Sequence, residues 1–505
     1  MARRNPAART EGQLGAIIIA LVLATGIAAW CVRLANQTLD YDEVQRAHSI
    51  WMTSEGLTPY QDFLECHPPY FVLLSPLVTK PSSPESLLIT LRIVAMLGNL
   101  LFIAGVGVAS VAVAGLDRRV AWFCTSIVAF HPSVLQYLSE FRIDGWGYAV
   151  VVWSGIRLSR SEGRWRHAEF GLTTGLATLL LSPKLTVLAP AMALFEAARV
   201  DGVLKRIRAF GSYGAGVLAS VLLFWGFLLV GGIPIGRTYE FLIRYHVLAN
   251  SHSGFGYGLF RMVADVPILS IPIVLGVLTY GWKQYRSKAI PDSFSGSVAI
   301  WLIVSVALVS YPYKQYSAPW LLFGSLFVSV LGMELLRQPR YVVAVASLIL
   351  CGLSMWTSGG QIHTLLRTPE ARQQLRILEL MSQASDPADH VVATPPCHPI
   401  DRLDSSFIWF NTIDPKSYGT EGILSESAAY REIVSERRYQ EELDTHPPAY
   451  VVVQFWSLYP PRLRSVLERY LEQHAYVPAT LGGLQFAVRP DRYDRFARLA
   501  AEGRR

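Results

Sequence analysis

The chain has 505 residues, of which 51% are hydrophobic and only 16% charged, with a formal net charge of +7. Soluble domains carry about 25% charged residues, and this chain also has a mean hydropathy of +0.31. Many of its apolar runs approach the ~20 residues that a helix needs to cross the hydrocarbon core. This composition excludes an ordinary soluble domain and predicts a polytopic helical membrane protein.

The N-terminal apolar run, Leu14 to Cys31, follows three arginines. It is longer than the apolar region of a signal peptide, and no small-residue cleavage site follows it. We therefore expect a retained first span with its N-terminus in the cytoplasm.

Basic residues stand in short clusters between the apolar stretches, a pattern that orients spans in the membrane and does not resemble a nucleic-acid-binding stripe. The clusters that we assign to the cytoplasm are Arg118-Arg119, Arg157 to Arg166, Lys205 to Arg208, Lys283 to Lys288, and Arg337 with Arg340. Between successive clusters the chain must leave the cytoplasm and return. The pattern predicts about eleven spans, an extracytoplasmic C-terminus and no nucleic-acid partner.

Two stretches are too short for the number of full-length spans that this alternation between the two sides of the membrane would require. Glu169 to Ala198 has cytoplasmic flanks at both ends, and we expect two short helices hinged at Ser182-Pro183-Lys184, with Lys184 near the outer lipid phosphates. The alternative is one helix kinked by Pro183, with Lys184 snorkelling to the interface. Tyr70 to Val78 is expected to be a juxtamembrane or re-entrant helix.

The character of the chain changes from Ser358 onward, where polar residues rise and no run of spanning length remains after the expected last span, Tyr341 to Trp356. The β-branched and helical patterns there predict a small α/β domain. The expected strands are His390–Thr394, Tyr450–Phe455 and Leu484–Val488, and the expected helices are Pro369–Ser382, Glu426–Leu443 and Pro461–Gln473. We therefore divide the chain into a transmembrane domain, 1–357, with its first outer loop at 37–83, and an extracytoplasmic domain, 358–505.

Acidic and cationic residues from several segments fall on the expected outer face. They are Asp40, Asp42, Glu43, His67, Arg142, Asp144, Lys184 and Lys314. This inventory suits group transfer from a phosphorylated lipid, because a base must take the acceptor's proton and fixed positive charge must meet the departing phosphate.

Each of these residues also has a structural explanation. The acids after the first span could cap a helix, Arg142 could pair with Asp144, Lys314 could anchor the chain at the interface, and His67 could belong to a rigid helix entry. Convergence of separate segments on one face favours a site. Cys66 and Cys397, each next to a His-Pro pair, are either free thiols or, in an oxidising compartment, a disulfide.

The pattern resembles the C-type integral-membrane glycosyltransferases, in particular the group of lipid A aminoarabinose transferases and protein O-mannosyltransferases. The matching elements share their order and spacing with that family. They are Asp42-Glu43, Gly56 with Pro59-Tyr60, His67-Pro68-Pro69, Leu91-Arg92, Arg142 with Asp144, Lys184 with Pro190, and Lys314 with Tyr316 and Pro319. The match covers most of residues 14–340.

The resemblance implies a bacterial inner-membrane enzyme that transfers a sugar from a polyprenyl-phosphate donor to an acceptor hydroxyl, with inversion. The acceptor would be a glycan, a lipid or a protein. The implied catalytic residues are Asp42 and Asp144. The implied donor-binding residues are Glu43, His67, Arg142, Lys184, Lys314 and Tyr316.

The loop at 233–258, with Arg244 and His246, is where we expect the acceptor to bind. We expect no obligatory metal, although the carboxylates are compatible with a divalent ion. The sequence departs from the family at Ser182-Pro183, where relatives often have Leu-Thr, and at Lys314, where His or Arg is common. Asp40 is a second candidate base.

Two other classes of protein stay open. A transporter or flippase of lipid-linked sugars would place ionisable residues near the bilayer midplane and would show internal repeats, and the sequence shows neither feature. A non-catalytic scaffold would use the C-terminal domain to bind partners.

Overall fold

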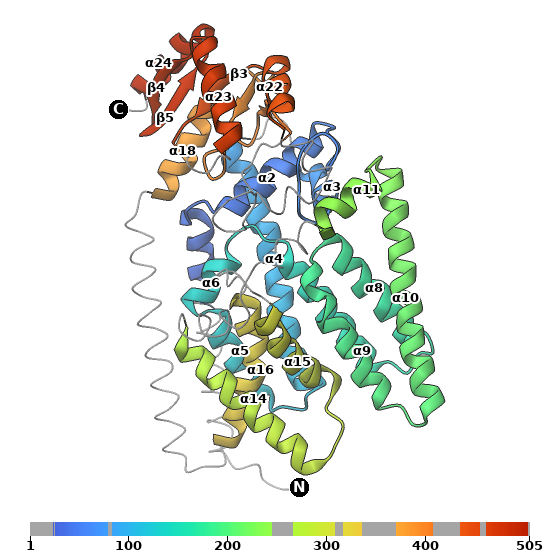
Figure 1. Ribbon diagram of the computed structural model, residues 1–505. Helices are drawn as coiled ribbons and strands as arrows, with labels where there is room; N and C mark the ends of the chain where they lie inside the picture. Colours follow the sequence, from blue (N-terminus) through green and yellow to red (C-terminus); the bar gives the residue numbers. More distant parts are fainter. Residues whose placement is uncertain are drawn as a thin grey trace. The chain divides into compact units, whose positions relative to one another are not determined.

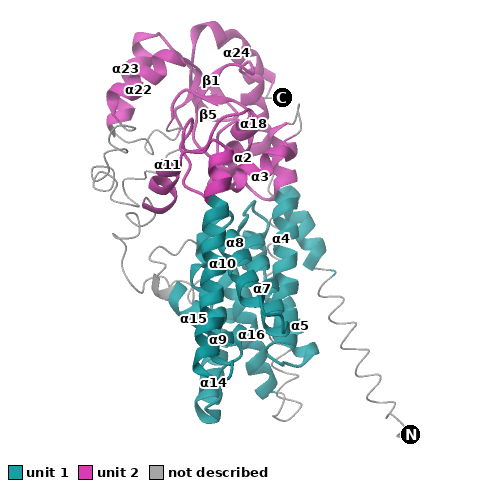
Figure 2. Ribbon diagram, turned by 90° about the vertical axis from the view of Figure 1, so that its right-hand side faces the viewer, with its two compact units in different colours: residues 1–36, 92–224, 254–367 teal, residues 37–91, 225–253, 368–505 magenta. Residues whose placement is uncertain are grey.

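The computed structural model describes residues 24, 26–78, 83–244, 266–308, 317–335, 370–407, 435–454 and 461–502. Lys314, Tyr316, His246, the expected last span and most of the first apolar run lie outside these residues. The chain forms two compact units (Figure 2): unit 1 contains residues 1–36, 92–224 and 254–367, and unit 2 contains residues 37–91, 225–253 and 368–505.

Unit 1 is a bundle of helices (Figure 1). Its elements are α4 (Pro84–Ala112, whose first turns belong to unit 2), α5 (Arg118–Ala129), α6 (Pro132–Leu138), α7 (Asp144–Arg160), α8 (Arg166–Leu180), η2 (Pro183–Thr186), α9 (Leu188–Ala198), α10 (Val203–Val230, ending in unit 2), α14 (Pro267–Ser287), α15 (Ser293–Leu308) and α16 (Ser317–Leu335). Among the described residues, α4, α10 and α16 are long and apolar enough to cross a membrane. These apolar helices agree with the predicted membrane class, whereas the count of eleven spans stays a prediction.

The core of unit 1 is held together by a cluster of aromatic rings from four helices. Phe102 of α4 packs against Phe323 of α16 with ring centroids 4.8 Å apart, and Trp301 of α15 lies 5.1 Å from Phe323. Tyr148 of α7 stacks on Phe102 at 5.2 Å. Edge-to-face and offset contacts of this kind add to the stabilisation that burial alone supplies, so the cluster fixes α7 against α4, α15 and α16.

The segment from Glu169 to Ala198 forms a hairpin, as the two-helix interpretation predicts. Helix α8 ends at Leu180, and Ser182 is extended, with φ −157° and ψ 114°. Leu181 and Leu185 both face Gly147 at the start of α7, whereas Phe170 of α8 and Met192 of α9 both face Gly155, two turns further on. The two helices therefore run in opposite directions along α7, and the single kinked helix is wrong.

Unit 2 contains the first loop and the C-terminal region. The loop elements are α2 (Tyr41–Ser54), α3 (Tyr70–Leu74), η1 (Ser75–Leu77), α11 (Ile235–Tyr239) and η3, a π-helical turn (Glu240–Arg244). The short helices α3 and η1 lie within Tyr70 to Val78, where the sequence predicts a juxtamembrane or re-entrant helix, and their place relative to a membrane stays a prediction. Phe241 of η3 stacks on Tyr60 of the first loop at 6.5 Å, so the two loops pack together within this unit.

The C-terminal region is built on a five-stranded sheet of order β2-β1-β3-β5-β4. The strands are β1 (His390–Val392), β2 (Leu403–Asp404), β3 (Pro448–Val452), β4 (Val477–Leu481) and β5 (Leu484–Val488), and the helices are α18 (Glu370–Gln383), α22 (Glu436–Thr445), α23 (Pro461–Gln473), η6 (Pro490–Arg492) and α24 (Tyr493–Glu502). Strand β1 is parallel to β2 and β3, and the pairs β3–β5 and β4–β5 are antiparallel.

Helices pack on both faces of this sheet. Residues of β3 contact both sets of helices, because neighbouring strand residues point to opposite sides. Val451 packs in a cluster with Tyr439 of α22 and Leu467 of α23. Tyr450 points the other way, where its ring meets Phe496 of α24 at 6.1 Å and its hydroxyl donates to a backbone carbonyl of α18. Each face therefore has its own helical layer.

Most of the C-terminal elements lie where the sequence predicts them. Strand β5 and helix α23 have the predicted bounds, and β1, β3 and α18 differ from them by one to three residues at an end. The prediction of a helix from Glu426 is testable only from residue 435 onward, where α22 runs to Thr445. Strands β2 and β4 were not predicted. The proposed division at 357/358 stays a prediction, and unit 2 groups residues 37–91 and 225–253 with the C-terminal region.

Candidate active site

The hinge of the α8–α9 hairpin brings a lysine onto the acid that begins α7. Lys184 Nζ donates to Asp144 Oδ2 at 2.9 Å, and Ser182 Oγ donates to Asp144 Oδ1 at 2.6 Å. Trp301 Nε1 donates to the Lys184 carbonyl at 3.4 Å and holds the hinge backbone against α15. The hinge sequence Ser-Pro-Lys thus supplies two donors to one carboxylate.

The predicted cation Arg142 is paired as well. Arg142 Nε donates to Glu140 Oε2 at 2.8 Å, and both side chains are buried. Glu140 also interacts electrostatically with Arg33 of the helical segment at residues 26–36. The sequence analysis did not include Glu140, although it lies two residues before Arg142 in the same turn.

These residues form the wall of an open pocket in unit 1. Three predicted site residues, Arg142, Asp144 and Lys184, line it together. The remaining lining residues are Asn99, Phe102, Tyr137, Leu138, Gly145, Tyr148, Ala318 and Pro319. Pro319 belongs to the element that the resemblance pairs with Lys314 and Tyr316, which lie outside the described residues. The pocket lining therefore combines two cations with the aromatic rings of Phe102, Tyr137 and Tyr148.

In unit 2, Asp42 occupies the first turn of α2. Asp40 is the N-cap of this helix, since its Oδ1 accepts from the Asp42 amide at 3.0 Å. Arg46, one turn further on, donates to Asp42 Oδ2 at 3.3 Å. Glu43 is fully buried. Asp40 therefore has the capping role that the sequence left open for this cluster, and Asp42 pairs with Arg46.

A chain of hydrogen bonds connects Arg46 to a buried acid. Arg46 Nη2 lies 3.3 Å from His67 Nε2, and His67 Nδ1 lies 2.7 Å from Glu65 Oε1. Because a guanidinium only donates, Nε2 accepts and Nδ1 carries the proton that His67 gives to Glu65. Burial raises the pKa of Glu65, but contact with His67 and a hydrogen bond from Ser49 lower it by a larger amount. The pKa of Glu65 therefore lies below its ordinary range.

Arg244, the described part of the expected acceptor loop, pairs with Glu240 of its own helical turn at 2.9 Å. Asp42, His67 and Arg244 belong to unit 2, whereas Arg142, Asp144 and Lys184 belong to unit 1. The structure thus brings the predicted residues together as two sets, and a single pocket containing both sets stays a prediction.

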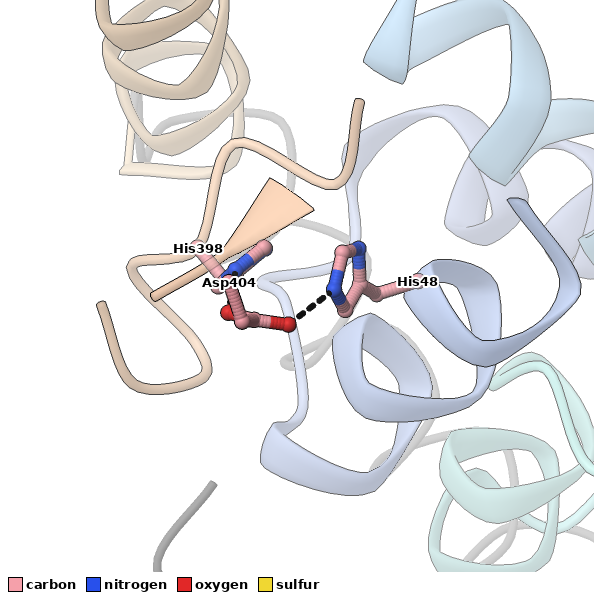
Figure 3. Close-up of side chains that lie close together, drawn as sticks. All are labelled: His48, His398 and Asp404. Atoms are coloured by element: carbon pink, nitrogen blue, oxygen red, sulfur yellow. Dashed lines mark hydrogen bonds and ion pairs between the residues drawn. The ribbon is translucent and has the colours of Figure 1, made fainter. Parts of the chain in front are cut away.

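Sequence reasoning missed Arg46, Glu65 and the buried group of His48, His398 and Asp404 (Figure 3). Arg46 carried a local signal, because a basic residue four positions after Asp42 lies on the same helix face. His48 and Asp404 are 356 residues apart, and no local pattern connects them.

Among the described residues, two groups of side chains could hold a metal ion: His48, His398 and Asp404, and the consecutive Glu65, Cys66 and His67. In the second group, burial raises the pKa of the Cys66 thiol well above its ordinary value. A protonated thiol is a poor metal ligand. Cys66 and Cys397 are both free thiols in this structure, which leaves the disulfide alternative without support.

No protein-family model matches the sequence, and no curated protein matches it. The fold is similar to that of ArnT in solved structures, which agrees with the resemblance drawn from the sequence. The chain is similar to ArnT from Cupriavidus metallidurans bound to undecaprenyl phosphate, with 14% identity, a TM-score of 0.60, and coverage of 93% of this chain and 97% of that one. The apo state of the same ArnT matches at 14% identity and a TM-score of 0.57, over 95% and 98% of the two chains. A further match is the Archaeoglobus fulgidus oligosaccharyltransferase in complex with zinc and sulfate, with 13% identity, a TM-score of 0.47, and coverage of 89% and 71%.

Proposed function

We propose that this protein transfers a sugar from a polyprenyl-phosphate donor to an acceptor hydroxyl on the extracytoplasmic face of a bacterial inner membrane, with inversion. The observation that carries the proposal is the unit 1 pocket. Lys184 and Arg142 both line it, and each is paired with an acidic residue. The shared fold supports it, since the similar ArnT structure holds undecaprenyl phosphate.

The charge of the pocket suits a phosphodiester that becomes a phosphate monoester. The charged residues that line the pocket, Arg142, Lys184 and Asp144, sum to one positive charge, and Arg33 and Glu140, which interact with each other outside the lining, cancel. The donor carries one negative charge, and the departing polyprenyl phosphate carries close to two. Lys314, by the resemblance, would add the further positive charge that favours departure over binding.

In the proposed reaction, the acceptor oxygen attacks the anomeric carbon as its proton passes to Asp42. The bond between that carbon and the phosphate oxygen breaks, and its electron pair leaves with the polyprenyl phosphate. Attack on the face opposite the leaving group inverts the anomeric centre. The ion pair with Arg46 favours the ionised form of Asp42, which a base requires. No step needs a metal ion.

The direct test is transfer from a radiolabelled polyprenyl-phosphate sugar by the purified protein in lipid nanodiscs. Lys184→Ala is expected to lose most of the transfer, and Lys205→Ala, an exposed lysine at the start of α10, is the matched control. If the protein in liposomes moved the labelled lipid across the bilayer without any sugar transfer, the result would favour the transporter alternative over the enzyme. Full activity in both variants would remove Lys184 from the donor site.

A further inference from the structure

The buried group of His48, His398 and Asp404 connects two distant parts of unit 2. His48 lies on α2, six residues after Asp42, whereas His398 and Asp404 lie in the segment between β1 and β2 and in β2. The two histidine side chains are fully buried and Asp404 is 6% exposed. Figure 3 shows His48 facing the carboxylate of Asp404 across the space between these segments.

Hydrogen bonds to the backbone of Ile400 fix the protons of both rings. The Ile400 carbonyl lies 2.5 Å from His48 Nδ1, so this nitrogen must donate. The Ile400 amide donates to His398 Nδ1 at 3.0 Å, so that nitrogen must be unprotonated. His398 therefore carries its proton on Nε2, which donates to Asp404 Oδ1 at 3.0 Å.

The remaining contact decides the charge of His48. Its Nε2 lies 2.7 Å from Asp404 Oδ2, and its Nδ1 already carries a proton. Burial raises the pKa of Asp404, but His48 and His398 lower it by more, which keeps the carboxylate ionised. His48 then carries a proton on both nitrogens. Burial lowers the pKa of His398 to about 4, in agreement with a neutral second ring.

A metal ion fits this arrangement less well than a proton. The three ligand atoms lie within 4.8 Å of one another, but a divalent ion needs a free lone pair on one ring nitrogen of each histidine. His398 has its lone pair on Nδ1, where the Ile400 amide points. Metal binding would require that ring to turn and to lose this hydrogen bond.

We propose that His48 is a buried imidazolium whose pairing with Asp404 holds α2 on the C-terminal sheet and so positions Asp42. Two further contacts join the same parts: the Leu39 amide donates to Gln374 Oε1 at 2.7 Å, and the Leu64 amide donates to the Phe407 carbonyl at 3.0 Å. His48 is a positioning residue, because it lies on the helix of the proposed base and acts through it.

Other rings also lie near this pair. On α2, Trp51 stacks on the His48 ring with centroids 5.6 Å apart. On the sheet side, His390 interacts electrostatically with Asp404 and stacks on His446 at 4.5 Å. The signals of His390 and His446 must be distinguished from those of His48 and His398 in any titration of the full chain.

The first test measures the protonation of the histidines and the metal content of the full chain. Nitrogen-15 NMR of the histidine-labelled full chain is expected to show one buried histidine with both ring nitrogens protonated at neutral pH, and metal analysis is expected to show no bound zinc. Absence of such a histidine would overturn the proposal. So would one equivalent of zinc that survives dialysis and is lost in His48→Gln.

The second test measures coupling between His48 and Asp404. Hydrogen exchange in α2 is expected to rise roughly 100-fold in His48→Gln and in Asp404→Asn, with no further rise in the double variant, because each change breaks the same buried pair. His474→Gln, an exposed histidine of the same unit, is the matched control. Additive effects of the two changes would refute the pairing.

Only one readout rests on the proposed function. If Asp42 is the base, the same variants lower kcat for sugar transfer by about tenfold, while KM for the lipid donor stays nearly constant. If the same tenfold loss of kcat/KM came from a higher KM with kcat unchanged, the positioning role would be refuted. The NMR and exchange results stand whether or not the protein transfers a sugar.

Discussion

The pairing of Lys184 with Asp144 leads to a sharp test of which residue acts on the donor. If Lys184 contacts the departing phosphate, Lys184→Ala removes one charged donor, and the loss of kcat/KM is expected to be about 10²- to 10³-fold, or about 3–4 kcal/mol of transition-state stabilisation. Asp144→Asn keeps the size of the side chain and removes the charge that holds the ammonium at 2.9 Å.

The expected cost of Asp144→Asn is smaller. The pair is partly exposed, with Lys184 at 32% and Asp144 at 21%, so screening by solvent limits its coupling to about 1 kcal/mol. This corresponds to a loss of roughly fivefold in kcat/KM. The double variant Lys184→Ala/Asp144→Asn is expected to be no slower than Lys184→Ala alone, since Asp144 would act through the lysine.

The measurement is initial-rate transfer from a labelled polyprenyl-phosphate sugar, with thermal unfolding of each variant in the same detergent to verify folding. Two results would refute the reasoning. A loss in Asp144→Asn larger than in Lys184→Ala would give the acid its own chemical role. Multiplication of the two losses in the double variant would mean that they act on separate steps.

Three further predictions concern other parts of the chain. Asp42→Asn is expected to reduce kcat by about 10²- to 10⁴-fold, because the amide cannot accept the acceptor's proton; Asp201→Asn, on an exposed loop, is the control in the same transfer assay. Gly276→Ala is expected to lower stability by about 1–3 kcal/mol, since its Cβ would overlap the backbone of the facing helix, whereas Gly211→Ala has open space; thermal unfolding compares the two. Acidification from about pH 6.5 to 4 is expected to cost up to about 3 kcal/mol through His398, because its pKa is about 4 when folded and near 6.5 when unfolded, so only the unfolded state gains the proton. His398→Gln should remove that part of the pH dependence of the melting temperature.

The sequence predicted the local elements well where one physical signal dominated. Helix α23 and strand β5 have the predicted bounds because amphipathic spacing and β-branched alternation were unambiguous there. The hinge at Ser182 to Lys184 followed from parity, since neither arm is long enough for a full span. Strand β4 was missed because it contains Pro478 and pairs only with β5 at the edge of the sheet, the place where a strand tolerates proline.

The candidate site was predicted as a list of residues and not as a set of contacts. Charge and position in the chain indicated Arg142, Asp144 and Lys184, and the pocket brings these three together. The pairing of Arg142 with Glu140 was missed, because a sequence cannot rank two acids at equal distance from one arginine. The His48–Asp404 contact was missed for a different reason: it depends on the packing of α2 against a sheet that begins 336 residues after the end of that helix (Ser54 to His390).

The two candidate acids, Asp144 and Asp42, have different contacts. Asp144 has both oxygens engaged, Oδ1 by Ser182 and Oδ2 by Lys184. To accept a proton at either oxygen it would have to give up a strong hydrogen bond, one of them charge-assisted, so it is a poor base. Asp42 lies in the first turn of α2, where the helix dipole and Arg46 favour the carboxylate. We infer that Asp144 orients the donor-side lysine and that Asp42 acts on the acceptor. In an otherwise active protein, Asp144→Asn should then leave the acid limb of the pH–rate profile unchanged, and Asp42→Asn should abolish it.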